Sequence, residues 1–360
     1  MKNVGIVTII DNDNYGNRLQ NYAVQEFLRE NGVNPKTLIN KNATNSKKNY
    51  IIRAIKTQLN ILLGRSSTSF EDRKNKFKEF NNNIEFAKKE LTAYSKISNQ
   101  YDFFVVGSDQ VWNPNFGRLR DVDLLTFARN EQKISFSSSF GINEIPQKLR
   151  KYVSDQLSSF KAISVREDIG KNIIEDLTER KDVEVLVDPT MLISSDKWDK
   201  LQKRPKQLDQ LKKKKYILNY FLGEIEKEWK EEIDRIAREN NCEVINLLDK
   251  KSPFYLTGPS EFLYLEKNAF LVCTDSFHSS VFSIIYNRPF IVFNRTGKDE
   301  KKKMSSRIDT LLSKFNLQER RFEGKITEEN LKHDYTETYK ILENEKQKSM
   351  TFLKKALDIK

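Results

Sequence analysis

Residues 269–286 read AFLVCTDSFHSSVFSIIY, an apolar run joined by a short polar turn to a run with helical spacing. The pattern predicts a buried strand at 269–273 and a helix at 276–286. His278 falls in the first turn of that helix, where backbone N–H groups and the positive end of the helix dipole favour a bound anion. The stretch therefore predicts one strand–helix unit of a parallel α/β sheet, with an anion site at its turn. His278, one of two histidines in the chain, is either a functional residue of that site or a histidine satisfied within the core.

The same alternation of apolar and helical segments extends outward over most of the chain. In the first half, strands are expected at 4–10, 103–106, 134–138, 162–165 and 183–187, and a helix at 17–30. Beyond a polar, lysine-rich stretch at 200–215, strands are expected at 216–221, 243–247, 269–273 and 289–293, and helices at 224–240 and 276–286. Such alternation is typical of doubly wound parallel sheets, so the sequence predicts an α/β fold with two domains.

The length of 360 residues also fits two domains better than one core. We expect an N-terminal domain at 1–192, a C-terminal domain at 193–327 and a charged helical tail at 328–360. For the tail, packing back on the N-terminal domain is one arrangement. An insertion at about 40–80 contains a basic amphipathic stripe with isoleucine or leucine at 51, 52, 55, 59, 62 and 63. Such a helix lies either on an anionic membrane surface or, more commonly, against the protein's own core or a partner chain.

The charge balance indicates which partners to expect. A net charge of +12 favours anionic partners, among them phosphorylated small molecules and lipid headgroups. The basic residues are scattered among acidic ones, and the chain has no zinc-finger spacing, RNP-type motif or glycine–lysine phosphate loop. Nucleic acid is therefore not an expected partner.

The scarcity of cysteine and histidine limits the compartment and the metal chemistry. Cys242 and Cys273 are too few for a disulfide framework and predict a reducing cytoplasm. The N-terminus lacks a signal-peptide pattern, and no apolar stretch approaches the roughly 18 residues needed to span a bilayer. With two histidines and two cysteines, no closed structural zinc site is expected.

Polar segments follow six of the expected strands. They are 12–17, 107–110, 139–141, 166–167, 188–189 and 274–278. In open α/β sheets, ligands bind beyond the carboxyl ends of the strands. We therefore expect these segments to converge on one cleft shared between the two domains.

Several of these segments resemble the polysaccharide pyruvyl transferase family. The matching strings are NYGN at 14–17, GSDQVW at 107–112, SVRE at 164–167, VDPT at 187–190, TDSFH at 274–278 and SSRI at 305–308. The resemblance runs from about residue 3 to about residue 320. It implies a fold similar to the GT-B glycosyltransferases, with two Rossmann-like domains facing across a cleft, the N-terminal one on the acceptor side and the C-terminal one on the donor side. It also implies phosphoenolpyruvate as donor, whose carboxyvinyl carbon is transferred to sugar hydroxyls as a ketal.

On this resemblance His278, Arg166 and Asp109 are the expected catalytic residues. His278 holds the phosphate or protonates the methylene carbon of the donor. Arg166 binds phosphate or carboxylate bidentately, with a salt bridge to Glu167 or Asp168 as the alternative. Asp109 orients or deprotonates the attacking hydroxyl, or else caps the following turn.

Further residues are expected to bind the substrates. A second cation would suit the other acidic group of the donor, and Lys298 is the expected residue, with Arg295 and the lysines at 301–303 as competitors. Trp112 either stacks on a sugar face or is a core tryptophan. The expected substrate-binding set is Lys298, Arg307, Ser276, Ser279, Asp275, Gly107, Ser108, Gly16, Asn17, Tyr15 and Trp112. Asp275 and Ser276 are more often helix caps than catalysts, and Ser279 stands where the family commonly has glycine, which we expect to tune the site.

The resemblance implies phosphoenolpyruvate as co-substrate, no required cofactor, and a nucleotide- or lipid-linked saccharide as acceptor. A divalent metal and peripheral contact with the inner face of the membrane are left open. Two other functions also stay open. One is a GT-B glycosyltransferase that uses a nucleotide sugar, and the other is a non-catalytic saccharide- or membrane-binding homologue.

Overall fold

The computed structural model describes residues 1–40, 68–91, 96–213, 215–296, 305–332 and 334–359. The amphipathic stripe expected at 51–63 and the expected substrate ligand Lys298 lie outside these ranges. By its contacts the chain divides into two units. The first comprises Met1–Pro189 together with Lys348–Lys360, and the second comprises Thr190–Gln347.

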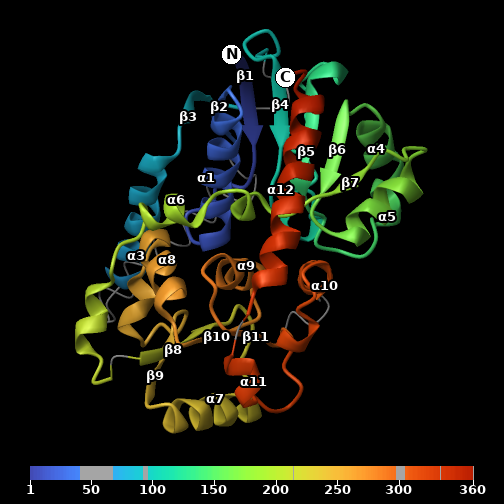
Figure 1. Ribbon diagram of the computed structural model, residues 1–360. Coiled ribbons are helices and arrows are strands. Elements are labelled where there is room, and N and C mark those ends of the chain that lie inside the picture. The colour runs from blue at the N-terminus through green and yellow to red at the C-terminus, as the bar shows by residue number, and fades with distance from the viewer. Residues whose placement is uncertain (41–67, 92–95, 214, 297–304, 333, 360) are drawn as a thin grey trace. The chain divides into compact units, whose positions relative to one another are not determined.

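The first unit contains a seven-stranded parallel sheet in the order β3-β2-β1-β4-β5-β6-β7 (Figure 1). Its strands are β1 (Lys2–Val7), β2 (Val33–Ile39), β3 (Phe86–Glu90), β4 (Phe103–Val106), β5 (Lys133–Ser138), β6 (Ala162–Val165) and β7 (Glu184–Val185). From β1 the chain winds outward to β2 and β3, then returns to the other side of β1 with β4. The pair β1–β4 is therefore the point at which the winding reverses, where such sheets place their ligand crevice.

Helices cover both faces of this sheet. They are α1 (Tyr15–Glu30), α3 (Thr68–Phe80), α4 (Gln147–Ser158), α5 (Asp168–Leu177) and the last turns of α12 (Thr336–Ala356). On one face, Val153 of α4 and Ile174 of α5 join the core cluster that contains Val7 and Phe104. On the other face, the ring of Phe136 in β5 stacks on Phe27 of α1 at 5.9 Å and on Phe352 of α12 at 6.3 Å.

The second unit contains a four-stranded parallel sheet in the order β11-β10-β8-β9. Its strands are β8 (Lys215–Tyr220), β9 (Cys242–Asn246), β10 (Leu271–Thr274) and β11 (Phe290–Val292). Its helices are α6 (Ser195–Asp199), α7 (Lys227–Glu239), α8 (Pro259–Asn268), α9 (Phe277–Ile285), α10 (Ser305–Lys314), α11 (Glu328–Leu331) and most of α12. In Figure 1, α7 covers one face of this sheet, and α8 and α9 cover the other.

Most of the predicted elements are confirmed. The strands expected at 103–106 and 162–165 coincide with β4 and β6, and the helix expected at 276–286 corresponds to α9. β2 and β3 were not predicted from the sequence. β2 reads VNPKTLI, and its Pro35 is tolerated because β3 pairs with β2 only from Thr37 onward, so that Pro35 lies on a locally open edge. β3 reads FAKKE, and its charged side chains face solvent at the edge of the sheet.

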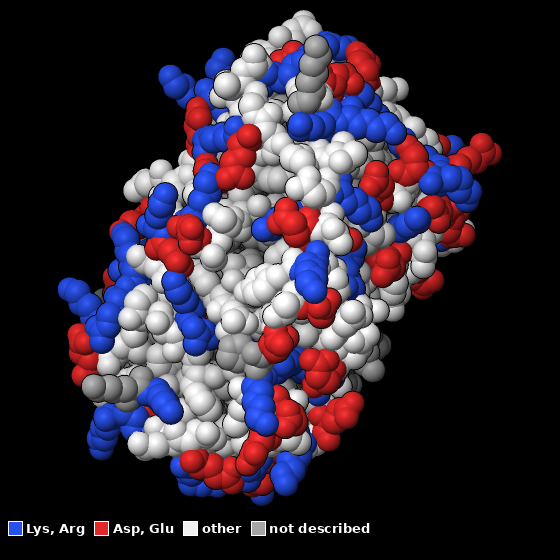
Figure 2. Space-filling view, in the orientation of Figure 1, with Lys and Arg blue, Asp and Glu red and all other residues white. Residues whose placement is uncertain are grey.

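Charge is mixed on the face of the molecule shown in Figure 2. Lysine and arginine side chains are interspersed there with aspartate and glutamate. This agrees with the scatter of basic and acidic residues along the sequence.

Among the residues that the structure describes, no helix is both long and apolar enough to cross a bilayer.

Phe136 is the side chain through which α1 and the end of α12 share one face of the first sheet. We predict that Phe136→Ala lowers the free energy of unfolding by about 3–5 kcal/mol, because it opens a cavity between two stacked rings. It should also speed amide exchange in Lys348–Lys360, since Phe352 loses its partner. Phe116→Ala is the control, because Phe116 is 39% exposed. Equal stability of the two variants in chemical denaturation would contradict the prediction.

Candidate active site

Polar residues at the carboxyl ends of the first sheet form one hydrogen-bonded network. Thr8, just beyond β1, donates from Oγ1 to the carbonyl of Ser108, just beyond β4, at 3.3 Å. Gln20 of α1 joins both, because its Nε2 donates to Thr8 Oγ1 at 2.8 Å and its Oε1 accepts from Ser108 N at 3.0 Å. The loops that follow β1 and β4 therefore meet within this unit.

Arg166 is the buried cation of this network. Its Nη2 donates to Asp109 Oδ1 at 3.0 Å and its Nη1 to Asp188 Oδ2 at 2.6 Å. Ser108 Oγ donates to the same Asp188 oxygen at 3.2 Å. Burial lowers the pKa of Arg166, but the charges of Asp109, Asp188 and Glu167 outweigh burial and raise the pKa overall. Arg166 thus joins the ends of β4, β6 and β7. If Arg166 contacts a substrate directly, its guanidinium must bind the substrate and the two carboxylates at the same time.

Glu167 organises the neighbouring loop beyond β5. Its Oε1 accepts from Ser139 Oγ at 2.8 Å, from Phe140 N at 3.0 Å and from Gly141 N at 3.4 Å. A salt bridge from Arg166 to Glu167 or Asp168 was the alternative expected from the sequence. In the structure Arg166 forms its ion pairs with Asp109 and Asp188, while Glu167 holds the backbone of the β5 loop.

The fold itself explains why glycine stands at position 107 and tryptophan at position 112. Gly107 has a φ of 124°, and a Cβ there would lie 2.2 Å from the carbonyl oxygen of Phe136. Trp112 is fully buried, donates from Nε1 to the carbonyl of Asp123 at 2.9 Å and packs on Phe140 at 5.1 Å. It occupies a core position, which the sequence analysis weighed against stacking on a sugar.

The first turn of α1 holds the other three predicted residues of this unit. Asn14 caps the helix by accepting from Asn17 N at 3.3 Å. Gly16 and Tyr15 are buried, and Tyr15 stacks on Phe77 of α3 at 5.1 Å. These residues fix where the loop after β1 enters the helix.

The loop after β1 also gathers charged residues that the sequence analysis missed. Arg18 of α1 is completely buried, donates to the carbonyl of Ile9 and to Asn81 Oδ1, and has its pKa lowered to about 10 by burial. Burial has the opposite effect on a carboxyl group and raises the pKa of Asp11, and the charges of Arg118 and Arg18 partly offset this. Asp11 lies beside the predicted segment 12–17 at a strand end, and that position is the signal that would have found it.

In the second unit, Asp275 braces the turn between β10 and α9. Its two carboxylate oxygens accept from Leu222 N at 2.7 Å and Gly223 N at 2.8 Å. Arg295 donates from Nε to the same carboxylate at 3.1 Å and from Nη2 to the Asp275 carbonyl at 3.0 Å. The negative charge of Asp275 is therefore engaged by the β8 loop and by Arg295.

The start of α9 gathers basic side chains. His278 lies in its first turn and is 7% exposed, and the guanidinium carbon of Arg307 lies 5.7 Å from the ring centre of Phe277. Ser276, at the N-cap position, forms no side-chain cap, and the first turn contains no acidic residue. One turn of the second unit thus brings together the positive end of this helix dipole and the side chains of His278, Arg295 and Arg307.

Ser279 faces inward from α9 to a carboxyl group that the sequence analysis also missed. Glu266 of α8 is fully buried and accepts from Ser279 Oγ at 2.5 Å and from Ser283 Oγ at 3.4 Å. Burial raises the pKa of Glu266 to about 8, and these two hydrogen bonds oppose the shift. The hydrophobic pattern could not identify Glu266, because it is a carboxylate at a position of α8 that is as buried as a core residue.

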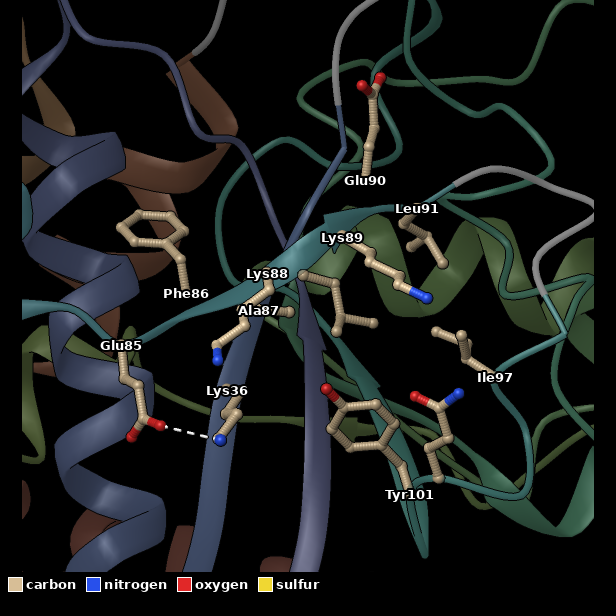
Figure 3. A pocket seen from close by; sticks show the side chains of 12 residues that line it. Lys36, Glu85, Phe86, Ala87, Lys88, Lys89, Glu90, Leu91, Ile97 and Tyr101 are labelled. Carbon is tan, nitrogen blue, oxygen red and sulfur yellow. Dashed lines mark ion pairs between the residues drawn. The ribbon is translucent and has the colours of Figure 1, made fainter.

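A separate pocket of about 340 Å³ lies beside the edge strand β3 (Figure 3). Its floor includes Leu38 and Leu91, and its rim includes Lys88 and Lys89. Lys36 forms an ion pair with Glu85 at 3.1 Å across one end, as the dashed line in Figure 3 shows. The residues that line this pocket include none of the strand-end residues described above.

The buried charges of Arg166, Asp109 and Asp188 predict a large mutational effect on stability. Arg166→Met leaves two buried carboxylates without their cation and should lower the free energy of unfolding by about 3–5 kcal/mol. The matched control is Arg150→Met, because Arg150 pairs with Asp176 at the surface, where the loss should stay within about 1 kcal/mol. Urea denaturation of both variants tests this, and similar losses would refute it.

Glu266 predicts a pH dependence of stability. Its pKa in the folded protein is raised from 4.5 to about 8, so its stabilising contribution is complete below pH 4.5 and is lost as pH rises to 8. The shift corresponds to roughly 5 kcal/mol at most. Glu266→Gln keeps the shape without the charge. The melting temperature of this variant, relative to that of the wild type, should therefore increase as pH rises over this interval. Parallel pH profiles would show that Glu266 does not titrate in this way.

The model of the family described as polysaccharide pyruvyl transferase matches residues 14–297. Among solved structures, UDP-GlcNAc 2-epimerase from Neisseria meningitidis bound to UDP-GlcNAc has a TM-score of 0.51 at 12% identity, covering 99% of this chain and 100% of that chain. UDP-GlcNAc 2-epimerase from Methanocaldococcus jannaschii has 0.48 at 13% identity, over 95% and 99%. MurG from Acinetobacter baumannii has 0.38 at 10% identity, over 99% and 95%. Among curated proteins no sequence matches.

The Neisseria structure confirms the fold class, since it spans both units and is a GT-B-fold enzyme. At this identity the likeness concerns the fold alone. The family model covers most of the chain, including the segments 107–112, 164–167 and 274–278 on which the resemblance was based. The chain belongs to the polysaccharide pyruvyl transferase family.

Proposed function

We propose that the protein transfers the pyruvyl group of phosphoenolpyruvate to two hydroxyl groups of a nucleotide- or lipid-linked saccharide, forming a ketal. Membership of the family supports transferase chemistry on a saccharide. Phosphoenolpyruvate is the co-substrate in this proposal, and no further cofactor enters it.

The observation that carries the proposal is the cationic start of α9. Phosphoenolpyruvate has a phosphate and a carboxylate, so its site needs at least two cationic donors. Arg295 and Arg307 lie at this turn, and the helix N-terminus adds its dipole. The carboxylate of Asp275 would repel such a ligand, but its two oxygens accept from two backbone amides, which partly offset its charge. In this proposal Arg295 serves as a second cation, the role for which Lys298 was expected and for which Arg295 and the lysines at 301–303 were the competitors; Lys298 lies outside the described residues.

The proposed reaction balances as follows. Two acceptor oxygens form bonds to carbon 2 of phosphoenolpyruvate, the bond from that carbon to the phosphate oxygen breaks, and the methylene carbon gains a proton. The two acceptor hydroxyls lose two protons in all. One proton is balanced by the proton that the methylene carbon gains, and the other leaves with inorganic phosphate. We assign the donation of a proton to carbon to His278, because it lies in the helix turn that would hold the phosphate.

The proposal predicts acceptor-dependent release of phosphate from phosphoenolpyruvate. His278→Ala should lower kcat about 100-fold or more, as loss of a general acid does. Arg295→Ala should mainly raise KM for phosphoenolpyruvate, because its charge would act in binding. Mass spectrometry of lipid- and nucleotide-linked saccharides should detect an added pyruvyl group with the wild type, and far less of it in the same time with His278→Ala.

His333→Ala is the matched control, since it removes the other histidine of the chain. Normal turnover by His278→Ala would overturn the assignment of its role. Melting temperatures with phosphoenolpyruvate and with UDP-sugars separate the proposal from a glycosyltransferase, because a bound ligand raises the melting temperature. Saccharide binding without any product, retained in both active-site variants, would favour a non-catalytic homologue instead.

A further inference from the structure

Asp11 and Asp109 stand at the point where the winding of the first sheet reverses. Asp11 lies in the loop after β1 and Asp109 in the loop after β4, and these two strands pair in parallel from Val4↔Phe103 to Val7↔Val106. The hydrogen bond from Thr8 to Ser108 joins the two loops beyond the strands. The crevice of an open α/β sheet lies at such a reversal, so both carboxylates are placed where a ligand is expected.

Arg118 brings a buried guanidinium to the same place. Its side chain is 2% exposed, and its nearest ion pair is a long one, 3.7 Å from Nη1 to Asp123 Oδ1. Arg120 already occupies that carboxylate, donating to both of its oxygens at 2.8 and 3.0 Å. Within the described part of the chain, Arg118 Nη1 is a buried donor with no hydrogen-bond acceptor. Such a group costs free energy in the folded protein unless a ligand accepts from it.

The charges around Arg118 indicate the chemistry of that ligand. Burial lowers the pKa of Arg118, and the charges of Asp123, Asp11 and Asp109 oppose this, so both strand-end carboxylates act electrostatically on the guanidinium. A phosphate or carboxylate here would be repelled by the charges of Asp11, Asp13 and Asp109. A hydroxyl group fits better, because it can accept from the guanidinium and donate to a carboxylate at the same time.

We propose that Asp11, Asp109 and Arg118 form a subsite for the hydroxyl groups of a saccharide. A sugar with neighbouring hydroxyls presents paired donors and acceptors, which match a planar guanidinium accompanied by two carboxylates. The subsite rests on the proposed function only in so far as this saccharide is the acceptor of the pyruvyl group.

Saturation-transfer NMR with the methyl glycosides of glucose, galactose, mannose, N-acetylglucosamine and N-acetylmannosamine tests the subsite directly. At least one glycoside should bind the wild type, and Asp11→Asn and Arg118→Met should each weaken it roughly tenfold or more. Arg118→Lys should restore part of the affinity, because it keeps the charge but loses the planar fork. Inorganic phosphate should not compete.

Asp176→Asn and Arg150→Met are the controls, since they make the same chemical changes in a surface ion pair of the same unit. Near-wild-type melting temperatures identify the variants that fold. The subsite is overturned if no glycoside binds the wild type, if binding survives in Asp11→Asn and Arg118→Met, or if phosphate displaces the sugar.

Turnover separates this inference from the proposed reaction. If sugar binding depends on Asp11 and Arg118 but no phosphate is released from phosphoenolpyruvate, the reaction fails and the subsite stands. If the reaction occurs, the same variants should raise KM for the acceptor and leave KM for phosphoenolpyruvate unchanged. An unchanged acceptor KM would remove the subsite and leave the reaction intact.

Discussion

The buried guanidinium of Arg166 is the constraint on which the first unit depends. Asp109 and Asp188 are removed from water at the ends of two different strands, and each carboxylate would be costly there without a cation. One arginine compensates both, so the loops after β4, β6 and β7 must end within reach of a single side chain. Asp109 meets this requirement with a positive φ of 66°, a conformation that aspartate tolerates better than most residues.

The two units differ in how charge is arranged at the ends of their strands. In the first unit, cations and carboxylates alternate at the strand ends, from Arg18 and Asp11 through Arg118 to Asp109 and Arg166. A surface of that kind suits neutral polar groups, which donate and accept. In the second unit the carboxylate of Asp275 is engaged, and the cationic groups at the start of α9 dominate. That arrangement suits an anion, and the contrast supports assigning the saccharide to one unit and phosphoenolpyruvate to the other.

The sequence was sufficient for what depends on local pattern. Apolar runs with polar ends predicted β4, β6 and α9 closely, and the strand-end positions of Asp109, Arg166 and His278 followed from them. It was not sufficient for partners that are distant along the chain. For Arg166 the alternative to binding a ligand was an ion pair with its neighbour Glu167 or Asp168, yet its observed ion pairs go to residues 57 and 22 positions away. The edge strand β3 was missed because its exposure removes the apolar signal.

Glu266 illustrates why some functional geometry carries no sequence signal at all. A carboxyl group in α8 is more costly to bury than an apolar side chain of similar size, so stability alone would not retain it. What it adds is direction, because its two oxygens accept from Ser279 and Ser283 on one face of α9. An apolar contact would allow α9 to rotate or slide by part of a turn, whereas two hydrogen bonds one helical turn apart define its rotation and register. His278 precedes Ser279 in the same turn, so these two hydrogen bonds also fix the stretch of helix backbone from which its imidazole projects.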